Sequence, residues 1–149
     1  MTIKYVHTNL VAKDWQRLAT FYVRVLGCKV KPPERDLKGE RIDLLTSMKN
    51  VHIRGIHLLL PGFGGNGPTL EIFQYSRGKR TTTVQTNHPG YGHIAFAVTN
   101  VGNMIKKIEK NGGSMVGKRI STTIKGVGTI DVAYTRDPEG NIIELQRWN

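Results

Sequence analysis

The stretch His7–Lys31, HTNLVAKDWQRLATFYVRVLGCKVK, can be laid over His93–Gly117, HIAFAVTNVGNMIKKIEKNGGSMVG, without a gap at an offset of 86 positions. A second pair of segments, Gly67–Phe73 and Gly140–Gln146, matches at an offset of 73 positions, with one glutamate in each apolar run. Each half of the chain therefore contributes one histidine and one glutamate at corresponding places: His7 and Glu71, then His93 and Glu144. This pattern indicates a duplicated domain.

The first half has the pattern of a strand followed by a helix. Residues 4–12 are rich in β-branched and aromatic types, which predicts a strand. Asp14 is placed to cap a helix whose apolar residues recur at helical spacing, and Gly27 is placed to end it. Extended structure is expected over residues 28–31, and Pro32-Pro33 is expected to break it.

A short amphipathic helix and two strands complete the first half. The helix is expected within segment 34–50, and the strands over His52–Leu60 and Thr69–Tyr75 on either side of a glycine-rich turn. The second half repeats this order, with a helix after Asn100 and strands over residues 92–98, 115–122, 127–136 and 141–147. The two halves differ by 13 residues, which segment 34–50 is expected to supply.

These elements predict an α+β fold built from tandem βαβββ modules. The first module is expected over residues 1–76 and the second over 91–149, with a basic, threonine-rich linker at 77–90. Strands connected in this way form mixed, mostly antiparallel sheets with helices on one face. The opposite face is then free to form a cupped sheet around a cavity.

The composition is that of an ordinary soluble domain. The chain has 149 residues, of which 38% are hydrophobic and 22% charged, so it can bury a substantial core. Its single cysteine, Cys28, excludes an intrachain disulfide and suits a reducing compartment. The sequence shows no membrane-spanning apolar run and no signal peptide at its N-terminus. We therefore expect a cytoplasmic protein without membrane partners.

The net charge of +11 is the unusual number in the composition. Such a charge concentrates anions near the surface. The basic residues form short scattered clusters, and no nucleic-acid-binding motif is present. A solvated basic surface is the simplest interpretation, a small anionic substrate is the second, and no nucleic-acid partner is expected.

The paired histidines and glutamates could bind a metal or could be structural. A single histidine in a strand is more often a hydrogen-bonded core residue, and a single glutamate could pair with an arginine or face solvent. Four such residues placed equivalently in two repeats favour a metal site near a pseudo-twofold axis. Two imidazoles and two carboxylates suit Ni²⁺, Co²⁺, Zn²⁺, Mn²⁺ or Fe²⁺. The predicted ligands are His7, Glu71, His93 and Glu144.

A metal in such a site can act as a Lewis acid on a carbonyl oxygen. A ligating glutamate that loosens from the ion can then act as base for a proton next to that carbonyl. Glu71 and Glu144 are therefore the candidate catalytic residues. No Ser/His/Asp arrangement is apparent, and Cys28 is interpreted as a packing residue between helix and strand.

The motifs that carry these residues resemble the vicinal oxygen chelate superfamily, which includes glyoxalase I, methylmalonyl-CoA epimerase, extradiol dioxygenases and the bleomycin and fosfomycin resistance proteins. The resemblance covers nearly the whole chain. It rests on His7–Asp14 with Phe21-Tyr22 and Leu26-Gly27, and on Gly67–Glu71, Gly92–Phe96 and Asp137–Glu144. The four predicted ligands fall where glyoxalase I-type members place theirs.

The resemblance implies a metal-dependent lyase or isomerase of the glyoxalase I type, acting as a homodimer on a small substrate with an anionic thiol or acyl carrier. Basic residues near the cavity would face that carrier, with Arg54, Lys125 and Arg136 as candidates. The epimerase often has Gln where this chain has Glu71, so Glu71 favours glyoxalase-like chemistry. An epimerase-like or dioxygenase-like enzyme and a metal-free binding module remain the alternatives.

Overall fold

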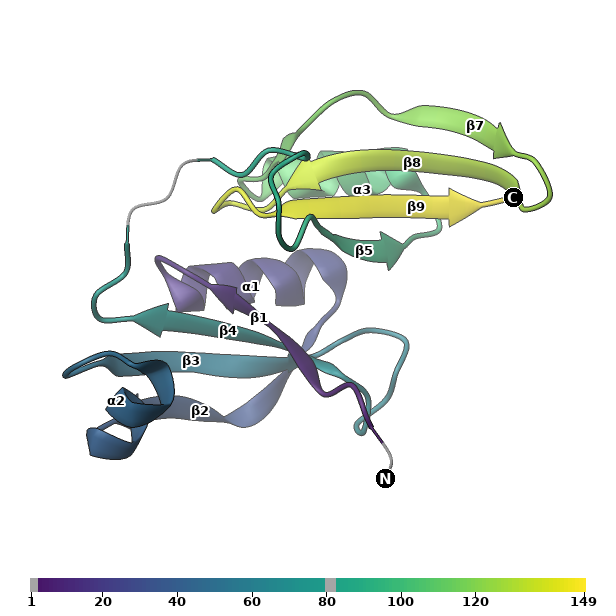
Figure 1. The fold of residues 1–149 in the computed structure, drawn as a ribbon. Helices are drawn as coiled ribbons and strands as arrows, with labels where there is room; N and C mark the ends of the chain where they lie inside the picture. The colour runs from purple at the N-terminus through teal and green to yellow at the C-terminus, as the bar shows by residue number, and fades with distance from the viewer. Residues whose placement is uncertain (1–2, 80–82) are drawn as a thin grey trace. The chain divides into compact units, whose positions relative to one another are not determined.

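The computed structural model describes residues 3–79 and 83–149, so part of the expected linker, residues 80–82, lies outside the described residues. The chain divides into two compact units, Met1–Arg80 and Thr81–Asn149. Each unit has its own mixed sheet and its own main helix (Figure 1). The prediction of an α+β fold with βαβββ modules is confirmed.

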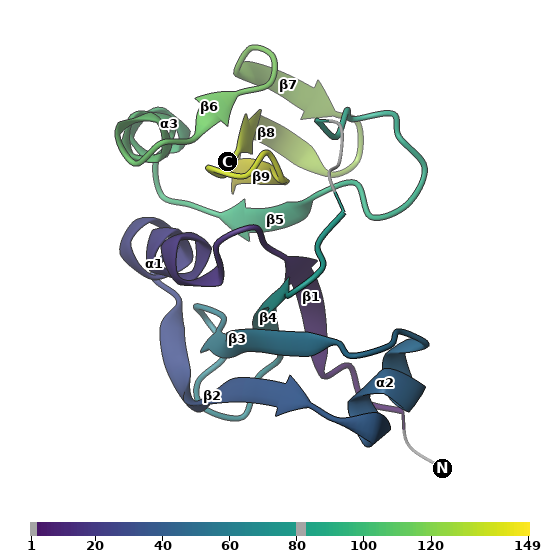
Figure 2. The same ribbon diagram turned by 90° about the vertical axis from the view of Figure 1, so that its left-hand side faces the viewer.

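Unit 1 consists of four strands and two helices. They are β1 (His7–Val11), α1 (Trp15–Leu26), β2 (Lys29–Lys38), α2 (Glu40–Thr46), β3 (His52–Leu59) and β4 (Thr69–Tyr75). The sheet has the order β1-β4-β3-β2, in which β1 and β4 are parallel and the other pairs are antiparallel. Helix α2 lies by β2 in both ribbon views (Figures 1 and 2).

Helix α1 is stabilised by a capping residue at each end and by a continuous apolar face. The Asp14 side chain accepts a hydrogen bond from the backbone N–H of Arg17, and Gly27 adopts the left-handed conformation that ends the helix. The buried face of α1 packs on β3 and β4, where Leu58 and Leu70 are fully buried. Alternate strand residues point to the other face of the sheet, which carries His7 and Glu71 and which α1 leaves uncovered.

Unit 2 repeats the plan. It contains β5 (Ile94–Ala97), α3 (Val101–Lys110), β6 (Ser114–Met115), β7 (Ile120–Ile124), β8 (Gly128–Arg136) and β9 (Ile142–Trp148). The sheet has the order β5-β9-β8-β6, with β7 also paired to β8, and β5 is parallel to β9. Asn100 caps α3 as Asp14 caps α1. The short strands β6 and β7 take the place that the single strand β2 has in unit 1.

Strand β2 continues past the point where the sequence predicted a break. Pro32 and Pro33 lie inside it, at a shift in the pairing register between Lys31 and Arg35. Because β2 is an edge strand and the register is irregular there, the missing proline N–H groups cost few ladder hydrogen bonds. The prediction that the prolines end the strand was therefore wrong.

The extra length of unit 1 is divided between two places. The loop before β4, residues 60–68, has nine residues, whereas the equivalent loop before β9, residues 137–141, has five. The remaining extra residues precede β3, in the region that contains α2. Segment 34–50 thus supplies most, but not all, of the difference. No helix in the described part of the chain is long and apolar enough to cross a membrane.

Cys28 is expected to be unreactive in the folded protein. Its side chain is 2% exposed between α1 and β2, and burial raises the pKa of the thiol from 9.0 to about 11. At pH 8 this shift lowers the thiolate population about 100-fold relative to an unfolded chain. We expect slow labelling by a disulfide reagent in native buffer and rapid labelling in guanidinium. Equally fast labelling in both would contradict the packing described for this junction.

Candidate metal centre

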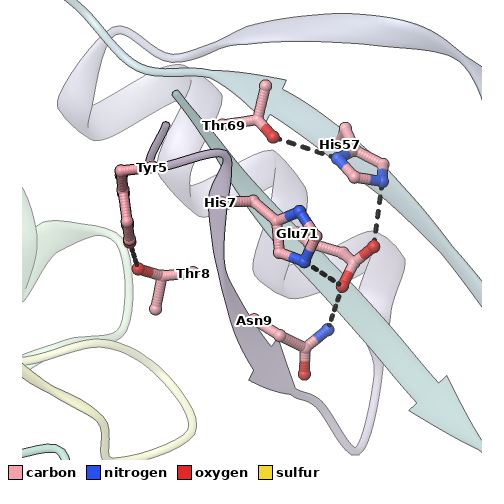
Figure 3. A network of polar contacts seen from close by, with 7 residues as sticks. All are labelled: Tyr5, His7, Thr8, Asn9, His57, Thr69 and Glu71. Atoms are coloured by element: carbon pink, nitrogen blue, oxygen red, sulfur yellow. Dashed lines mark hydrogen bonds and ion pairs between the residues drawn. The ribbon is translucent and has the colours of Figure 1, made fainter. Parts of the chain in front are cut away.

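Glu71 is the centre of a polar cluster on the uncovered face of the unit 1 sheet. Its Oε2 atom lies 3.5 Å from His7 Nε2 and accepts a hydrogen bond of 2.8 Å from the Asn9 side-chain amide. His7 and Asn9 come from β1 and Glu71 from the parallel strand β4 (Figure 3). The glutamate side chain is only 12% exposed, whereas His7 is 40% exposed. A largely buried carboxylate is thus held beside a more accessible imidazole.

His57 holds the other oxygen of Glu71. It lies on β3 directly opposite Glu71, and its Nε2 is 2.9 Å from Glu71 Oε1. Its Nδ1 is 3.0 Å from the hydroxyl of Thr69. Figure 3 shows His57 and His7 on either side of the Glu71 carboxylate. Glu71 is therefore oriented by groups from both neighbouring strands.

Hydrogen-bond chemistry assigns the tautomer of His57. Burial lowers the pKa of His57, and the positive charges of Arg35 and Lys31 lower it further, against the opposing charge of Glu71. The imidazole is therefore neutral at pH 7. An ionised carboxylate only accepts, so His57 Nε2 carries the hydrogen and donates to Glu71. Nδ1 then accepts from the Thr69 hydroxyl.

Unit 2 contains a second His–Glu pair. His93, immediately before β5, has its Nε2 atom 3.1 Å from Oε2 of Glu144 on β9. Tyr134 on β8 stands opposite Glu144, and its ring centroid is 5.1 Å from that of His93. Burial raises the pKa of Tyr134, and the charge of Glu144 and a hydrogen bond to it raise it further. The phenol therefore stays protonated and donates to the carboxylate.

The two pairs occupy the same places in their sheets. Glu71 and Glu144 are each the third residue of a strand that pairs in parallel with the first strand of its unit. The residue opposite Glu71 is Asn9, two positions after His7. The residue opposite Glu144 is Ala95, two positions after His93. The internal repeat of the sequence therefore corresponds to an equivalent strand register in the two units.

The two pairs differ in the groups around them. The third strand of each unit places His57 opposite Glu71 but Tyr134 opposite Glu144. Ala95 offers no counterpart to the amide of Asn9. Among the residues that the structure describes, Glu71 is therefore held by more donors than Glu144, whose carboxylate is less restrained.

The chemistry of the donor set in unit 1 fits a divalent metal ion. One ligand atom from each of His7, His57 and Glu71 lies within 4.8 Å of the others. Imidazole nitrogen and carboxylate oxygen are ligands of Zn²⁺ and of neighbouring first-row ions. The pair His93 and Glu144 supplies the same two kinds of donor atom in unit 2.

The three basic residues predicted to contact a substrate lie apart from these pairs. Arg54 is exposed on β3 between Ile53 and Gly55, so strand alternation places it on the face that α1 covers, opposite to His57. Lys125 is exposed in the turn between β7 and β8. Arg136 shares a face with Tyr134, but its guanidinium donates to the backbone oxygens of Val84 and Gly140.

His57 and Tyr134 are site residues that the sequence alone did not predict. Both belong to strands that pair antiparallel with the glutamate strand, and both stand directly opposite the glutamate. The usable signal was strand alternation, since residues at even spacing from His57 share its face. To pair His57 with Glu71, one must know the register of β3 on β4. The glycine-rich loop before β4 has no fixed turn pattern from which that register could be predicted.

Comparison with known proteins places these features in a family. The family model described as the Glyoxalase/Bleomycin resistance protein/Dioxygenase superfamily matches residues 4–145. The chain belongs to this superfamily, as the resemblance in the sequence indicated.

Curated relatives match over most of their length. The chain is 32% identical over 144 residues to a lactoylglutathione lyase of Escherichia coli O157:H7, covering 96% of this chain and 91% of that protein. It is 28% identical to a probable lactoylglutathione lyase of Vibrio parahaemolyticus, covering 95% and 88%. A solved structure of a glyoxalase family protein from Bacillus cereus superposes with a TM-score of 0.75 at 17% identity, covering 98% and 93%. This last likeness concerns the fold alone.

Proposed function

We propose that the protein is a divalent-metal-dependent lyase of the glyoxalase I type. The observation that carries the proposal is the pair His7–Glu71 in unit 1 and the pair His93–Glu144 in unit 2, at the same register positions. These four residues are the proposed ligands of one ion, which we expect to be Ni²⁺, Co²⁺, Zn²⁺, Mn²⁺ or Fe²⁺. When bound, the ion supplies a Lewis acid for a carbonyl oxygen of the substrate.

Glu144 is the proposed catalytic base. Its carboxylate takes the proton from the carbon atom next to the carbonyl group and delivers a proton, exchanged with solvent while the carboxylate holds it, to the neighbouring carbon. The hydroxyl oxygen of the first carbon loses its proton and becomes the new carbonyl, and the former carbonyl oxygen gains a proton, so that substrate and product are isomers. Its smaller number of hydrogen-bond donors supports this role, because a base has to change partners during the reaction. The protonated phenol of Tyr134 stays beside the carboxylate and orients it.

Glu71 has the complementary role in this proposal. Asn9 holds one of its oxygens and His57 the other. A carboxylate with a hydrogen bond on each oxygen is well suited to remain a metal ligand. It is less suited to act as a base, which has to change partners. Glu71 is therefore assigned mainly to metal binding, with a secondary contribution as base.

The substrate is proposed to be a conjugate of glutathione with a small carbonyl compound. The names of the curated relatives, lactoylglutathione lyase, support this choice at 26–32% identity. An acyl-CoA substrate, as for an epimerase, is the alternative that the experiment must separate. We propose that the protein works in the cytoplasm as a homodimer.

The test is metal content together with proton exchange. Untagged protein is purified without a nickel column and subjected to elemental analysis. We expect about one divalent ion for each set of the four proposed ligands, which is about one ion per chain. After reaction in D₂O, the product of a glutathione hemithioacetal is expected to carry solvent deuterium at the carbon next to the carbonyl. His93→Gln should lose both properties, whereas His88→Gln, outside both pairs, should keep them.

Two results would overturn this proposal. Protein that binds small apolar ligands tightly without metal would be a binding module of the resistance-protein kind. Exchange of an acyl-CoA α-proton without turnover of the hemithioacetal would identify an epimerase. Mixing the His7→Gln and His93→Gln proteins also tells how the ligand set is assembled, because activity returns only if two copies share their pairs.

A further inference from the structure

A basic cavity lies beside the Glu71 cluster in unit 1. Its volume is about 460 Å³, and it is bounded by the residues before β1, the start of β2, His57 on β3 and the loop before β4. Of the lining residues that the structure describes, three are cations and none is acidic. The lining residues that matter here are Lys4, Lys31, Arg35, Tyr5, Asn66 and Thr69.

The strand register directs two of the cations to the face that carries Glu71. Lys31 pairs with His57 and Arg35 pairs with Gly55, so both side chains lie on the His57 side of the sheet. Their charges lower the pKa of His57, as expected for cations close to the imidazole. These cations are thus close to His57, the hydrogen-bond partner of the proposed ligand Glu71.

These cations have no carboxylate partner within residues 3–79 and 83–149. No ion pair joins Lys4, Lys31 or Arg35 to an aspartate or glutamate of the described chain, and Arg35 Nη1 donates instead to the backbone oxygen of Pro33. Arg35 is half-buried, which limits solvent screening of its charge. The remaining guanidinium N–H groups can donate to a planar carboxylate or a phosphate.

We propose that this cavity is the binding site for the anionic end of the substrate's thiol carrier. Lys31 and Arg35 contact the carboxylate or phosphate, Lys4 adds charge at the rim, and the amide of Asn66 supplies a polar contact. This inference rests on the proposed function, and it replaces Arg54, Lys125 and Arg136 as the expected anion contacts. It assigns the net positive charge a local role.

Thioethers that cannot react are suitable probes for this site. N-acetyl-S-hexylglutathione carries two carboxylates and no amine charge, and its diethyl ester is neutral. S-hexyl-coenzyme A carries phosphates, and S-hexylpantetheine lacks them. Isothermal titration of each probe into metal-loaded protein measures the Kd. We expect the charged member of one pair to bind about 10-fold or more tightly than its neutral partner, and that pair identifies the carrier.

Charge removal at the cavity supplies the second arm of the experiment. The double variant Lys31→Gln/Arg35→Gln should raise the Kd of the charged probe by about 10- to 100-fold and leave that of the neutral probe unchanged. It should also flatten the dependence of the Kd on ionic strength. The matched control Arg24→Gln/Lys106→Gln removes two exposed charges that lie outside this cavity. It should leave both affinities as in the natural sequence.

The outcomes separate this inference from the proposed function. Metal content and deuterium incorporation report on the proposed function, and the double variant should retain both. Its defect should be a higher KM with an unchanged kcat. Equal binding of charged and neutral probes in both pairs would overturn the cavity assignment. So would an equal loss of affinity in the control variant, because a general surface field would then explain the effect.

Discussion

Glu144→Gln is expected to lower kcat by about 10²–10⁴-fold at saturating metal, the usual scale for losing a positioned acid or base. Glutamine keeps the shape of the side chain and one oxygen, but it loses the charge and the ability to take a proton. The hydrogen bond from Tyr134 can still reach that oxygen, so the fold of the site should be retained. Turnover of a hemithioacetal by the metal-saturated variant is the measurement.

Two controls make this result specific. Glu71→Gln should have a smaller effect, because Asn9 and His57 hold that carboxylate as a fixed ligand. Glu109→Gln makes the same change on the exposed side of α3 in the same unit and should have no effect. If Glu144→Gln kept a normal kcat with full metal content, Glu144 would not be the base.

His57→Phe should weaken metal binding about 10- to 100-fold, the scale reported for groups that orient a metal ligand. Phenylalanine fills similar space on β3, but it cannot donate to Glu71 Oε1. The carboxylate is then held by Asn9 alone and turns more freely beside His7. Competition titration with a metal-binding dye measures the affinity without reference to activity.

The same substitution at a second histidine of β3 provides the control. His52 lies half-buried at the start of the strand, five residues before His57, and its Nε2 is 2.8 Å from Asp36 Oδ1. His52→Phe should leave metal affinity unchanged. His57→Gln keeps a side-chain N–H and should recover part of the affinity. Unchanged metal affinity in His57→Phe, which keeps the packing and loses only the hydrogen bond, would contradict the orienting role of His57.

The fold could be predicted because the chain repeats itself. A histidine, a helix cap, a helix and a closing glycine recur at a constant offset, and each signal is local. The glutamates could be found because a charged residue within an apolar run is conspicuous. The structure then places each histidine beside the glutamate of its own unit, at 3.5 Å in unit 1 and 3.1 Å in unit 2.

The partners of the glutamates could not be predicted in the same way. His57 meets Glu71 only through the register of an antiparallel pair, and Tyr134 meets Glu144 likewise. These two positions differ between the repeats, so the alignment of the halves gave no reason to compare them. Arg54 illustrates the opposite error, since net charge does not reveal which face of a strand a cation occupies.

The prolines of β2 limit how two copies of this chain can meet. An edge strand offers unpaired backbone groups to any other strand, and this exposure is a common origin of aggregation. Pro32 and Pro33 have no backbone N–H to offer, and they lie where the register of β2 is already irregular. A neighbouring molecule therefore cannot extend this sheet by continuous pairing along β2. A stable assembly of copies has to be built from side-chain contacts or from another edge, and the protein gains a safeguard against fibrous stacking.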